Sequence, residues 1–295
     1  MIKNSAKGDG MGVSIIADSA TDVSQETAEK WGISIIPLKI RFGEEEFLDG
    51  VTLSNKNFYE KLVETDELPK TSQISPSDYT EYFEKELNKG NDIVCLTISS
   101  GVSGCIQSAN LAASELKGNI YVVDSKQFCI SYYILVEYAV RLRDEGKSAR
   151  EIAKEIERLR GKSTVLSVFD TLEYLKAGGR LSPTAAFVGE ILSIKPVITI
   201  TDGIVDVIGK ARGSKKGNNI LKNKVIELGG IDFSMPICVG YTGLSDDLLV
   251  KYLEDSSDLY DGDISDINKV SVGATIGTYA GPGAIAVAFF PKGVK

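Results

Sequence analysis

The apolar residues in the first half of the chain form short continuous runs separated by amphipathic segments. Runs rich in valine and isoleucine lie at residues 13–17, 33–36, 93–98 and 120–123. Such runs are typical of strands that are buried on both faces of a parallel sheet. The segments between and after them predict helices at residues 25–31, 54–64, 76–88, 103–116 and 132–145, and a further helix opened by the Ser148–Glu151 capping box. We therefore predict a parallel sheet with helices on both faces.

The pattern changes after residue 163, where the strands alternate apolar and polar residues. Residues 197–201 and 204–208 form a predicted hairpin around an Asp202–Gly203 turn. The other elements predicted in this half are helices at residues 183–193, 216–228 and 246–253 and a last strand at 284–290. Alternating strands of this kind predict a mixed sheet covered by helices.

These elements indicate an α/β fold with two domains, which agrees with a length of 295 residues. The first is an N-terminal parallel-sheet α/β/α domain at residues 11–163, with a small hairpin excursion near residues 37–53. The second is a two-layer α/β domain with a mixed sheet at residues 164–295. Residues 1–10 are expected to be either an extension or a remnant of cloning ahead of Met11.

Composition narrows the classes of function. The net charge is -8 and the lysines and arginines form no dense run, so we expect no nucleic-acid partner. We also expect no membrane span and no signal peptide, because no apolar stretch has the required length. The chain contains no histidine, which excludes Ser-His-Asp and Cys-His nucleophile systems and imidazole metal sites as they are usually built. We expect neither a metal nor a cofactor.

The four cysteines lie far apart and have no C-x-x-C spacing. They therefore predict neither a disulfide framework nor a zinc site, and they fit a reducing cytoplasm. The cysteines are Cys95, Cys105, Cys129 and Cys238.

Hydroxyls and carboxylates follow several predicted strands, in loops at residues 18–22, 71–75, 99–104 and 124–125. Because ligands bind at the carboxyl ends of parallel strands, one site could collect all four loops. The loop at 99–104 precedes a helix whose free N–H groups attract an anion. An ordinary serine-capped turn would explain the same residues equally well.

Two enzymatic alternatives use residues of these loops. A phosphatase would use Asp18 or Asp22, but an aspartyl-phosphate site expects two carboxylates two positions apart and here the spacing is four. A hydrolase would use Ser103, but the glycine that a nucleophile elbow has two residues after its serine is missing, and there is no histidine to activate the serine. Ser103 is therefore better explained as a hydrogen-bond donor. Cys105 begins the same helix and is either a reactive thiol or, more simply, a small packing residue.

Eight short motifs follow one another from about Val13 to the C-terminus. Together they resemble the DegV family of bacterial fatty-acid-binding proteins. The motifs are Asp18–Asp22, Lys70–Gln73, Ser99–Ser108, Val123–Ser125, Leu175–Arg180, Ile194–Pro196, Lys210–Arg212 and Gly277–Gly283.

The resemblance implies that one long-chain fatty acid, such as palmitate or oleate, lies between the two domains. It implies that the carboxylate is bound by Thr71, Ser103, Gly104 and Tyr279, with Ser72, Ser100, Asp18 and Asp124 in the supporting loops. The sequence departs from the family at Cys105, where threonine is frequent, and at Tyr279, where histidine is usual.

The resemblance also implies a role in phospholipid metabolism without chemistry of the chain's own. The chain would be a lipid-binding subunit that presents the carboxylate to a separate ATP-dependent fatty acid kinase, which forms the acyl-phosphate. Arg180 and Arg212, each set among glycines, would contact the acyl-phosphate or the kinase. From their spacing alone, these arginines are better explained as solvated surface residues.

Overall fold

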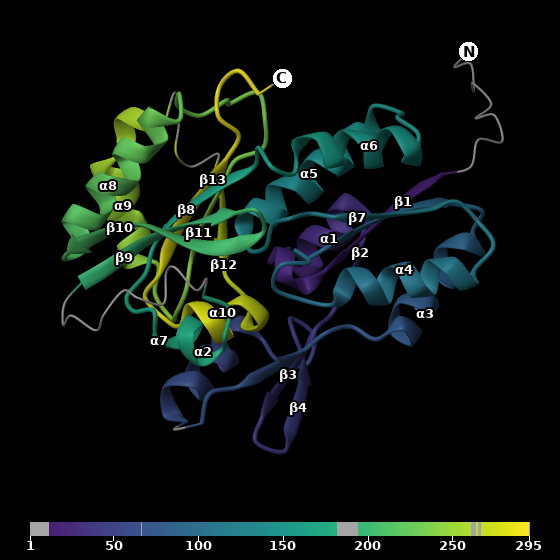
Figure 1. Ribbon diagram of the computed structural model, residues 1–295, viewed down its shortest axis with the longest axis horizontal. Coiled ribbons are helices and arrows are strands. Elements are labelled where there is room, and N and C mark those ends of the chain that lie inside the picture. The colour runs from purple at the N-terminus through teal and green to yellow at the C-terminus, as the bar shows by residue number, and fades with distance from the viewer. Residues whose placement is uncertain (1–11, 66, 182–193, 261–263, 265–266, 295) are drawn as a thin grey trace, which may run out of the picture.

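The structure is a computed structural model that describes residues 12–294 apart from 66, 182–193, 261–263 and 265–266 (Figure 1). Its first sheet has four parallel strands in the order β2-β1-β6-β7. The strands are β1 (Val13–Asp18), β2 (Ser34–Ile36), β6 (Asp92–Thr97) and β7 (Ile120–Asp124). The predicted parallel sheet is therefore confirmed.

Helices cover both faces of this sheet, as predicted. The pair α3 and α4 packs on one face and the pair α5 and α6 on the other (Figure 1). Serine side chains cap α1, α3 and α6, and two of these caps are complete capping boxes, formed by Ser75 with Asp78 and by Ser148 with Glu151. The helices of this half are α1 (Gln25–Trp31), α3 (Pro76–Leu87), α4 (Cys105–Glu115), α5 (Ile130–Asp144) and α6 (Ala149–Leu159), and the 3-10 helix η1 (Ser19–Thr21) follows β1.

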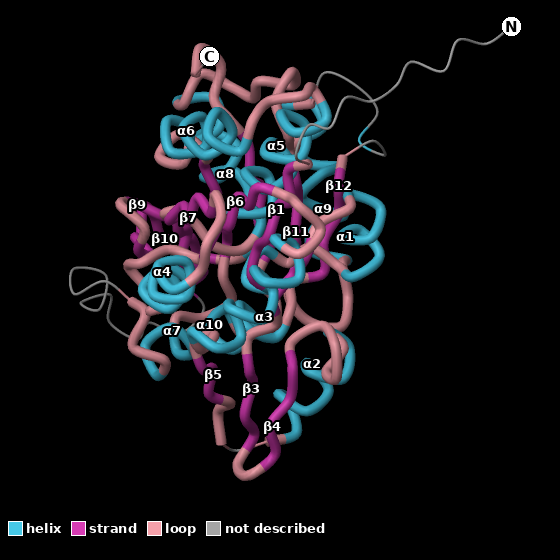
Figure 2. The backbone as a smooth tube through the Cα atoms, turned by 90° about the vertical axis from the view of Figure 1, so that its right-hand side faces the viewer, coloured by secondary structure: helices cyan, strands magenta, loops and turns pink. Residues whose placement is uncertain are grey.

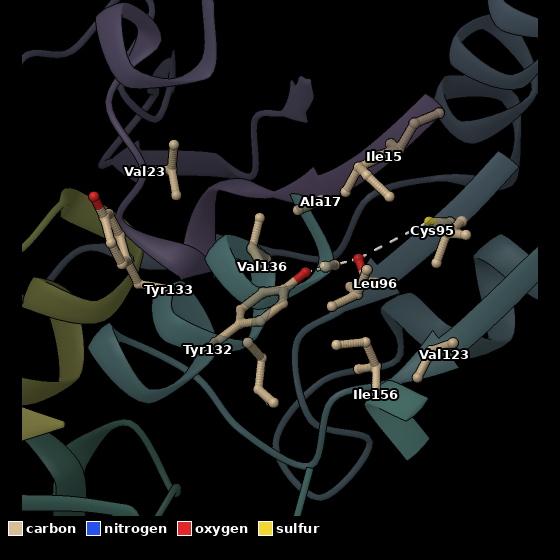
Figure 3. Close-up of a cluster of buried hydrophobic side chains, with 14 of the residues drawn as sticks. Ile15, Ala17, Val23, Cys95, Leu96, Val123, Tyr132, Tyr133, Val136 and Ile156 are labelled. Atoms are coloured by element: carbon tan, nitrogen blue, oxygen red, sulfur yellow. Dashed lines mark hydrogen bonds between the residues drawn. The ribbon is translucent and has the colours of Figure 1, made fainter. Parts of the chain in front are cut away.

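Tyr132 of α5 lies in the centre of the core (Figure 3). Its hydroxyl donates to the Leu96 carbonyl at 2.7 Å and accepts from the Asp18 N–H at 3.3 Å. The ring can be fully buried because these bonds satisfy its polar tip. The same apolar cluster continues to Ala286 and Phe290 of the second sheet, so α5 packs against both sheets.

The second sheet has six strands in the order β10-β9-β8-β13-β11-β12 and is mixed, as predicted, because only β11 and β12 are parallel. Asp202 and Gly203 both have positive φ in the β9–β10 turn, which is the geometry expected of an Asp-Gly hairpin. The strands are β8 (Thr164–Val168), β9 (Ile194–Thr201), β10 (Ile204–Arg212), β11 (Cys238–Tyr241), β12 (Asn268–Ser271) and β13 (Ile285–Phe289).

Helices α8 (Ser214–Glu227) and α9 (Asp247–Asp255) pack on this sheet, and the 3-10 helix η3 (Ser257–Leu259) follows α9. The predicted helix at residues 183–193 and the extension at 1–10 lie outside the described residues. Within the described part of the chain, no helix is long and apolar enough to cross a membrane.

A third, antiparallel sheet of three strands projects at one end of the molecule (Figure 2). Its strands β3 (Lys39–Phe42) and β4 (Glu45–Leu48) form the predicted hairpin, and helix α2 (Asn55–Glu64) follows. Its third strand, β5 (Lys70–Ser72), corrects the prediction of a plain loop, because it pairs with β3. Three polar residues carry no periodicity, so only the backbone pairing with a distant strand makes them a strand.

Two short helices, α7 (Glu173–Ala177) and α10 (Ala274–Ala280), contact each other beside the small sheet. Helix α10, which overlaps the Gly277–Gly283 motif, was not predicted from the sequence. The helix is rich in small residues and threonine, which are poor helix signals, and its N-terminus is stabilised by residues far away in the sequence.

Candidate ligand-binding site

A cavity of about 280 Å³ lies where elements of both halves of the chain meet. It is small for a ligand pocket but enclosed by many apolar side chains. Its apolar lining is Leu38, Ile98, Val102, Phe128, Phe169, Leu175, Ile198, Val205, Ile276 and Ala280. Its polar lining is Thr71, Gln73, Ser103, Gly104, Arg180, Thr275 and Tyr279.

The predicted residues Thr71 and Tyr279 meet at the polar end of the cavity. The Thr71 Oγ1 and the Tyr279 hydroxyl are 2.6 Å apart, although the two residues are separated by 208 positions. Strand β5 and helix α10 bring them together, and α10 contacts both β5 and β3. Two hydroxyls at this distance share one hydrogen between them, so the other hydrogen remains available to a ligand.

Ser103 and Gly104 line the same cavity at the start of α4. Gly104 is the N-cap residue of that helix and makes no side-chain cap, so the first N–H groups of α4 have no partner from a cap. A Cβ at Gly104 would lie 2.0 Å from Gln73 Oε1, so a larger residue here would require the Gln73 side chain to move. The Ser103 hydroxyl, 3.2 Å from Cys105 Sγ, completes a group of donors suited to an anion.

Arg180 lies at the edge of the cavity. Its guanidinium carbon is 5.0 Å from the centre of the Tyr279 ring, and its Nη1 donates to the Gly178 carbonyl at 2.7 Å. The side chain is exposed, and it is the one charged group among the described residues that line the cavity. Arg212 is exposed near the end of β10 and does not line the cavity, so the structure brings only one of the two predicted arginines to it.

Helices α7 and α10 pack through a reciprocal pair of glycines and rings. A Cβ at Gly178 would lie 2.4 Å from the Tyr279 ring, and a Cβ at Gly281 would lie 2.3 Å from the Tyr174 ring. Gly281 also has a φ of +66°. Because each aromatic ring lies on the other segment's glycine, the orientation of Tyr279 in the cavity is fixed.

Asp49 holds the other end of α10 and was missed by the sequence analysis. Its carboxylate accepts hydrogen bonds from the N–H groups of Ala274 and Thr275 at 3.0 and 3.2 Å, from Thr275 Oγ1 at 2.5 Å and from Ser19 Oγ at 2.9 Å. Burial raises its pKa above the usual value. Its partners on α10 lie 225 and 226 positions away, so no local signal could have identified this cap.

Asp18 supports the cavity wall without lining the cavity. It is completely buried, its Oδ2 accepts from the Ile98 N–H at 2.6 Å, and its Oδ1 accepts from the Ala20 N–H at 3.2 Å. Burial raises its pKa to about 7. Asp22 accepts from the Gly273 N–H at 2.8 Å, and burial raises its pKa to about 8.

The remaining predicted residues lie behind or beside the cavity lining. Asp124 Oδ1 accepts from the Ser100 N–H at 3.1 Å; burial opposes its ionisation, but hydrogen bonds from Ser100 and Lys126 hold its pKa below the usual value. Ser100 Oγ accepts from Lys126 Nζ at 2.8 Å. Ser72 follows Thr71 on β5 and is exposed, because successive side chains of a strand point to opposite faces.

This geometry does not favour the enzymatic alternatives. The described lining of the cavity contains no Asp, Glu, Lys or His that could act as a base for Ser103. Asp18 accepts from backbone N–H groups through both of its oxygens and Asp22 through Oδ1, and neither residue lines the cavity. In the described part of the chain, no group of three or more Cys, Asp or Glu side chains is placed to hold a metal ion.

The DegV family model matches residues 12–292. A DegV domain-containing protein of Caldanaerobacter subterraneus is 35% identical over 291 residues, which cover 95% of this chain and 99% of that protein. A DegV domain-containing protein of Deinococcus radiodurans is 32% identical, with 95% and 99% covered.

Solved structures with a similar fold include fatty-acid-binding proteins. A fatty-acid-binding DegV family protein from Thermus thermophilus superposes with a TM-score of 0.85 at 29% identity, covering 95% of this chain and 100% of that chain. A stearic-acid-binding protein from Eubacterium ventriosum superposes with a TM-score of 0.83 at 27% identity, covering 94% and 98%. By its sequence motifs, its fold and these relatives, this chain belongs to the DegV family.

Proposed function

We propose that this chain binds one long-chain fatty acid in the cavity, with the acyl chain along the apolar lining and the carboxylate at the polar end. The observation that carries the proposal is the form of the cavity. Its lining is mostly apolar; among its polar residues, the hydroxyls of Thr71 and Tyr279 are 2.6 Å apart, and Gln73 lies against Gly104 at the start of α4, next to Ser103. Relatives whose structures bind fatty acids share this fold.

The polar end suits a carboxylate better than a neutral head group. Hydrogen bonds to an ionised acceptor are shorter and stronger than those between neutral groups. The positive end of the α4 dipole adds to them. No described residue of the lining is acidic, so nothing there repels the ligand's charge.

The apolar lining supplies the affinity. Each buried methylene contributes about 0.8 kcal/mol, so a chain of roughly fourteen contributes on the order of 10 kcal/mol before the costs of ordering. Phenylalanines from two different segments, Phe128 and Phe169, contribute large apolar surfaces to the lining.

The proposal extends to presentation of the carboxylate to a separate ATP-dependent kinase in the cytoplasm. The described lining of the cavity offers donors to bind a carboxylate but no base and no carboxylate of its own, so phosphoryl transfer would need groups from the kinase. Arg180 at the edge would stabilise the acyl-phosphate or contact the kinase, and the exposed Arg212 would contact the kinase.

Lipid extraction from purified protein tests the binding proposal. The protein, expressed in a bacterium and purified without detergent, should release close to one equivalent of long-chain fatty acid, quantified by mass spectrometry. The Ser103→Ala variant should carry less, and Ser114→Ala, an exposed serine further along α4, should carry as much as the parent. A parent that carries no acyl chain and binds neither added palmitate nor added oleate would contradict the proposal.

A further inference from the structure

The turn of the β9–β10 hairpin lies directly on the loop that carries Ser103. The Ser99 hydroxyl donates to the Gly203 carbonyl at 2.8 Å and accepts from the Gly101 N–H at 3.1 Å. Ser99 is completely buried. One hydroxyl therefore joins the turn of the second sheet to the loop of the first.

The contact is tightly packed from both sides. A Cβ at Gly101 would lie 2.6 Å from the Gly203 carbonyl oxygen and 2.9 Å from Ile204 Cγ2. A Cβ at Gly203 would lie 2.3 Å from Ser99 Oγ, and Gly203 has a φ of +84°. Neither glycine has room for a methyl group while the turn is in place.

The loop side of this contact is rigidly held. The Ser99 carbonyl accepts from the N–H groups of Val102 and Ser103 at 3.1 and 3.2 Å, and the Ser99 N–H donates to the Gln127 carbonyl at 2.9 Å. The neighbouring Ser100 is bound by the Asp124 carboxylate and the Lys126 amine. The loop is thus fixed to its own sheet by several hydrogen bonds.

The hairpin side has fewer supports. Strand β10 is the edge strand of its sheet, and β8 pairs with β9 only from Val197 to Thr199, so the tip of the hairpin extends past β8. The ladder is also irregular between Val207 and Gly209. A two-stranded tip beyond the body of a sheet is marginally stable by itself, so it can lift away while the rest of the sheet remains intact.

The hairpin forms part of the cavity wall. Val205 from β10 and Ile198 from β9 line the cavity, as Ser103 does. Val205 also forms a bridge with Leu181, the residue after Arg180. Lifting the hairpin would therefore remove an apolar wall and disturb the segment that carries Arg180.

We propose that the contact of Ser99, Gly101 and Gly203 is a latch that closes the cavity over the acyl chain, and that its release is the step through which the fatty acid enters and leaves. This inference rests on the proposed function. Ser99 and Gly101 are then positioning residues, since neither lines the cavity. The latch controls the rates of exchange, while Thr71, Ser103 and Tyr279 control the affinity.

The Gly101→Ala variant tests the latch. Gly101 has no positive φ, so alanine adds only a methyl group that collides with Gly203. Gly161→Ala is the matched control, because its Cβ would meet nothing within 4 Å and its φ is also ordinary. The assay is stopped-flow fluorescence with cis-parinaric acid, which measures uptake directly and release after a chase with excess oleate.

Gly101→Ala should raise both the association and the dissociation rate, each by about tenfold, while Gly161→Ala behaves like the parent. Loss of an ordinary contact would raise the dissociation rate alone, so acceleration of both rates is specific to a gate. Ser99→Ala adds no volume and removes the bond to Gly203, and it should accelerate both rates to a smaller degree. It also keeps the test valid if Gly101→Ala does not fold.

Two outcomes overturn the latch while leaving the proposed function intact. In the first, the parent binds the fatty acid, and Gly101→Ala and Ser99→Ala exchange it at rates within about twofold of the parental rates. The other is a rise in the dissociation rate with no change in association. If the parent takes up no fatty acid at all, the proposed function and the latch both fail.

Discussion

The guanidinium of Arg180 lies over the ring of Tyr279, with 5.0 Å from Cζ to the ring centre. The hydroxyl of the same tyrosine is 2.6 Å from Thr71 Oγ1. Tyr279 therefore connects the edge of the cavity with its polar end. The ring serves as a platform for a cation, which is a favourable arrangement at a partly exposed site, and the hydroxyl serves the ligand.

These two roles can be separated by substitution. Tyr279→Phe keeps the ring and removes the hydroxyl, so it should weaken fatty-acid binding by roughly 1 to 3 kcal/mol, the cost of leaving a charged acceptor short of one partner. Acyl-phosphate formation by a kinase, measured at saturating fatty acid, should be little changed. Tyr279→Ala should impair both measurements. If Phe and Ala impair turnover equally at saturation, the ring is not the platform for Arg180.

Thr71→Ala and Ser103→Ala should each weaken fatty-acid binding by roughly 1 to 3 kcal/mol, for the same reason. Ser72→Ala is the matched control, because Ser72 follows Thr71 on the same strand and is exposed. Isothermal titration with palmitate measures all three. If both Thr71→Ala and Ser103→Ala bind palmitate with parental affinity, the carboxylate binds elsewhere.

Arg180→Ala and Arg212→Ala should leave fatty-acid affinity nearly unchanged and slow acyl-phosphate formation with a competent kinase. The reason is that Arg180 lies at the edge and Arg212 outside the lining. Arg150 is an exposed arginine on α6, so Arg150→Ala is the control and should support acyl-phosphate formation at the parental rate. Equal losses of binding and turnover in Arg180→Ala would instead assign it to the carboxylate.

The buried carboxylates should make stability fall as the pH rises. Burial raises the pKa of Asp18 to about 7 and that of Asp22 to about 8, so between about pH 4 and 8 the folded state binds more protons than the unfolded state. The chain has no histidine that would titrate in the same range. Thermal unfolding should show a lower midpoint at pH 8 than at pH 5.

Asp18→Asn cannot ionise, so its midpoint should vary less between these two pH values, whatever its absolute stability. Asp78→Asn changes an acidic residue on the surface of α3 and should keep the parental difference. A parental midpoint that is flat or rises from pH 5 to 8 would show that the buried aspartates ionise as freely in the folded state as in the unfolded state.

Tyr279→His should introduce a pH dependence of binding. An imidazole gains charge between about pH 8 and 5, and a charged ring beside Thr71 would hold the carboxylate more tightly. Binding of palmitate, measured against the parent at pH 6 and pH 8, should therefore tighten on the acid side in the variant. If the ratio of the affinities at pH 6 and pH 8 is the same in the variant and the parent, position 279 does not face the carboxylate.

The sequence predicted the elements whose signals are local. Strand runs such as 93–98, the Ser148 cap and the Asp202–Gly203 turn all have causes within a few residues, and all are present. Strand β5 and helix α10 were missed, because a distant strand and the carboxylate of Asp49 stabilise them.

The cavity residues were identified in a different way. Thr71 and Tyr279 are 208 positions apart, so no local sequence pattern could predict that they lie in one site. They were assigned to the same site only because their motifs resemble those of the DegV family. Asp49 and Ser99 act by positioning other residues, and the sequence offered no reason to assign a role to either of them. Their importance follows from contacts across the fold, which a single sequence does not contain.

Helix α5 contacts strands of both large sheets, and its apolar residues belong to one cluster with Ala286 and Phe290. Cutting the chain near residue 163 would leave that face of α5 open to water in one fragment and remove the cover of β11 and β13 in the other. The two halves would then aggregate instead of folding separately. Heat or denaturant should accordingly unfold the full chain in a single cooperative transition, in which both large sheets lose their structure together.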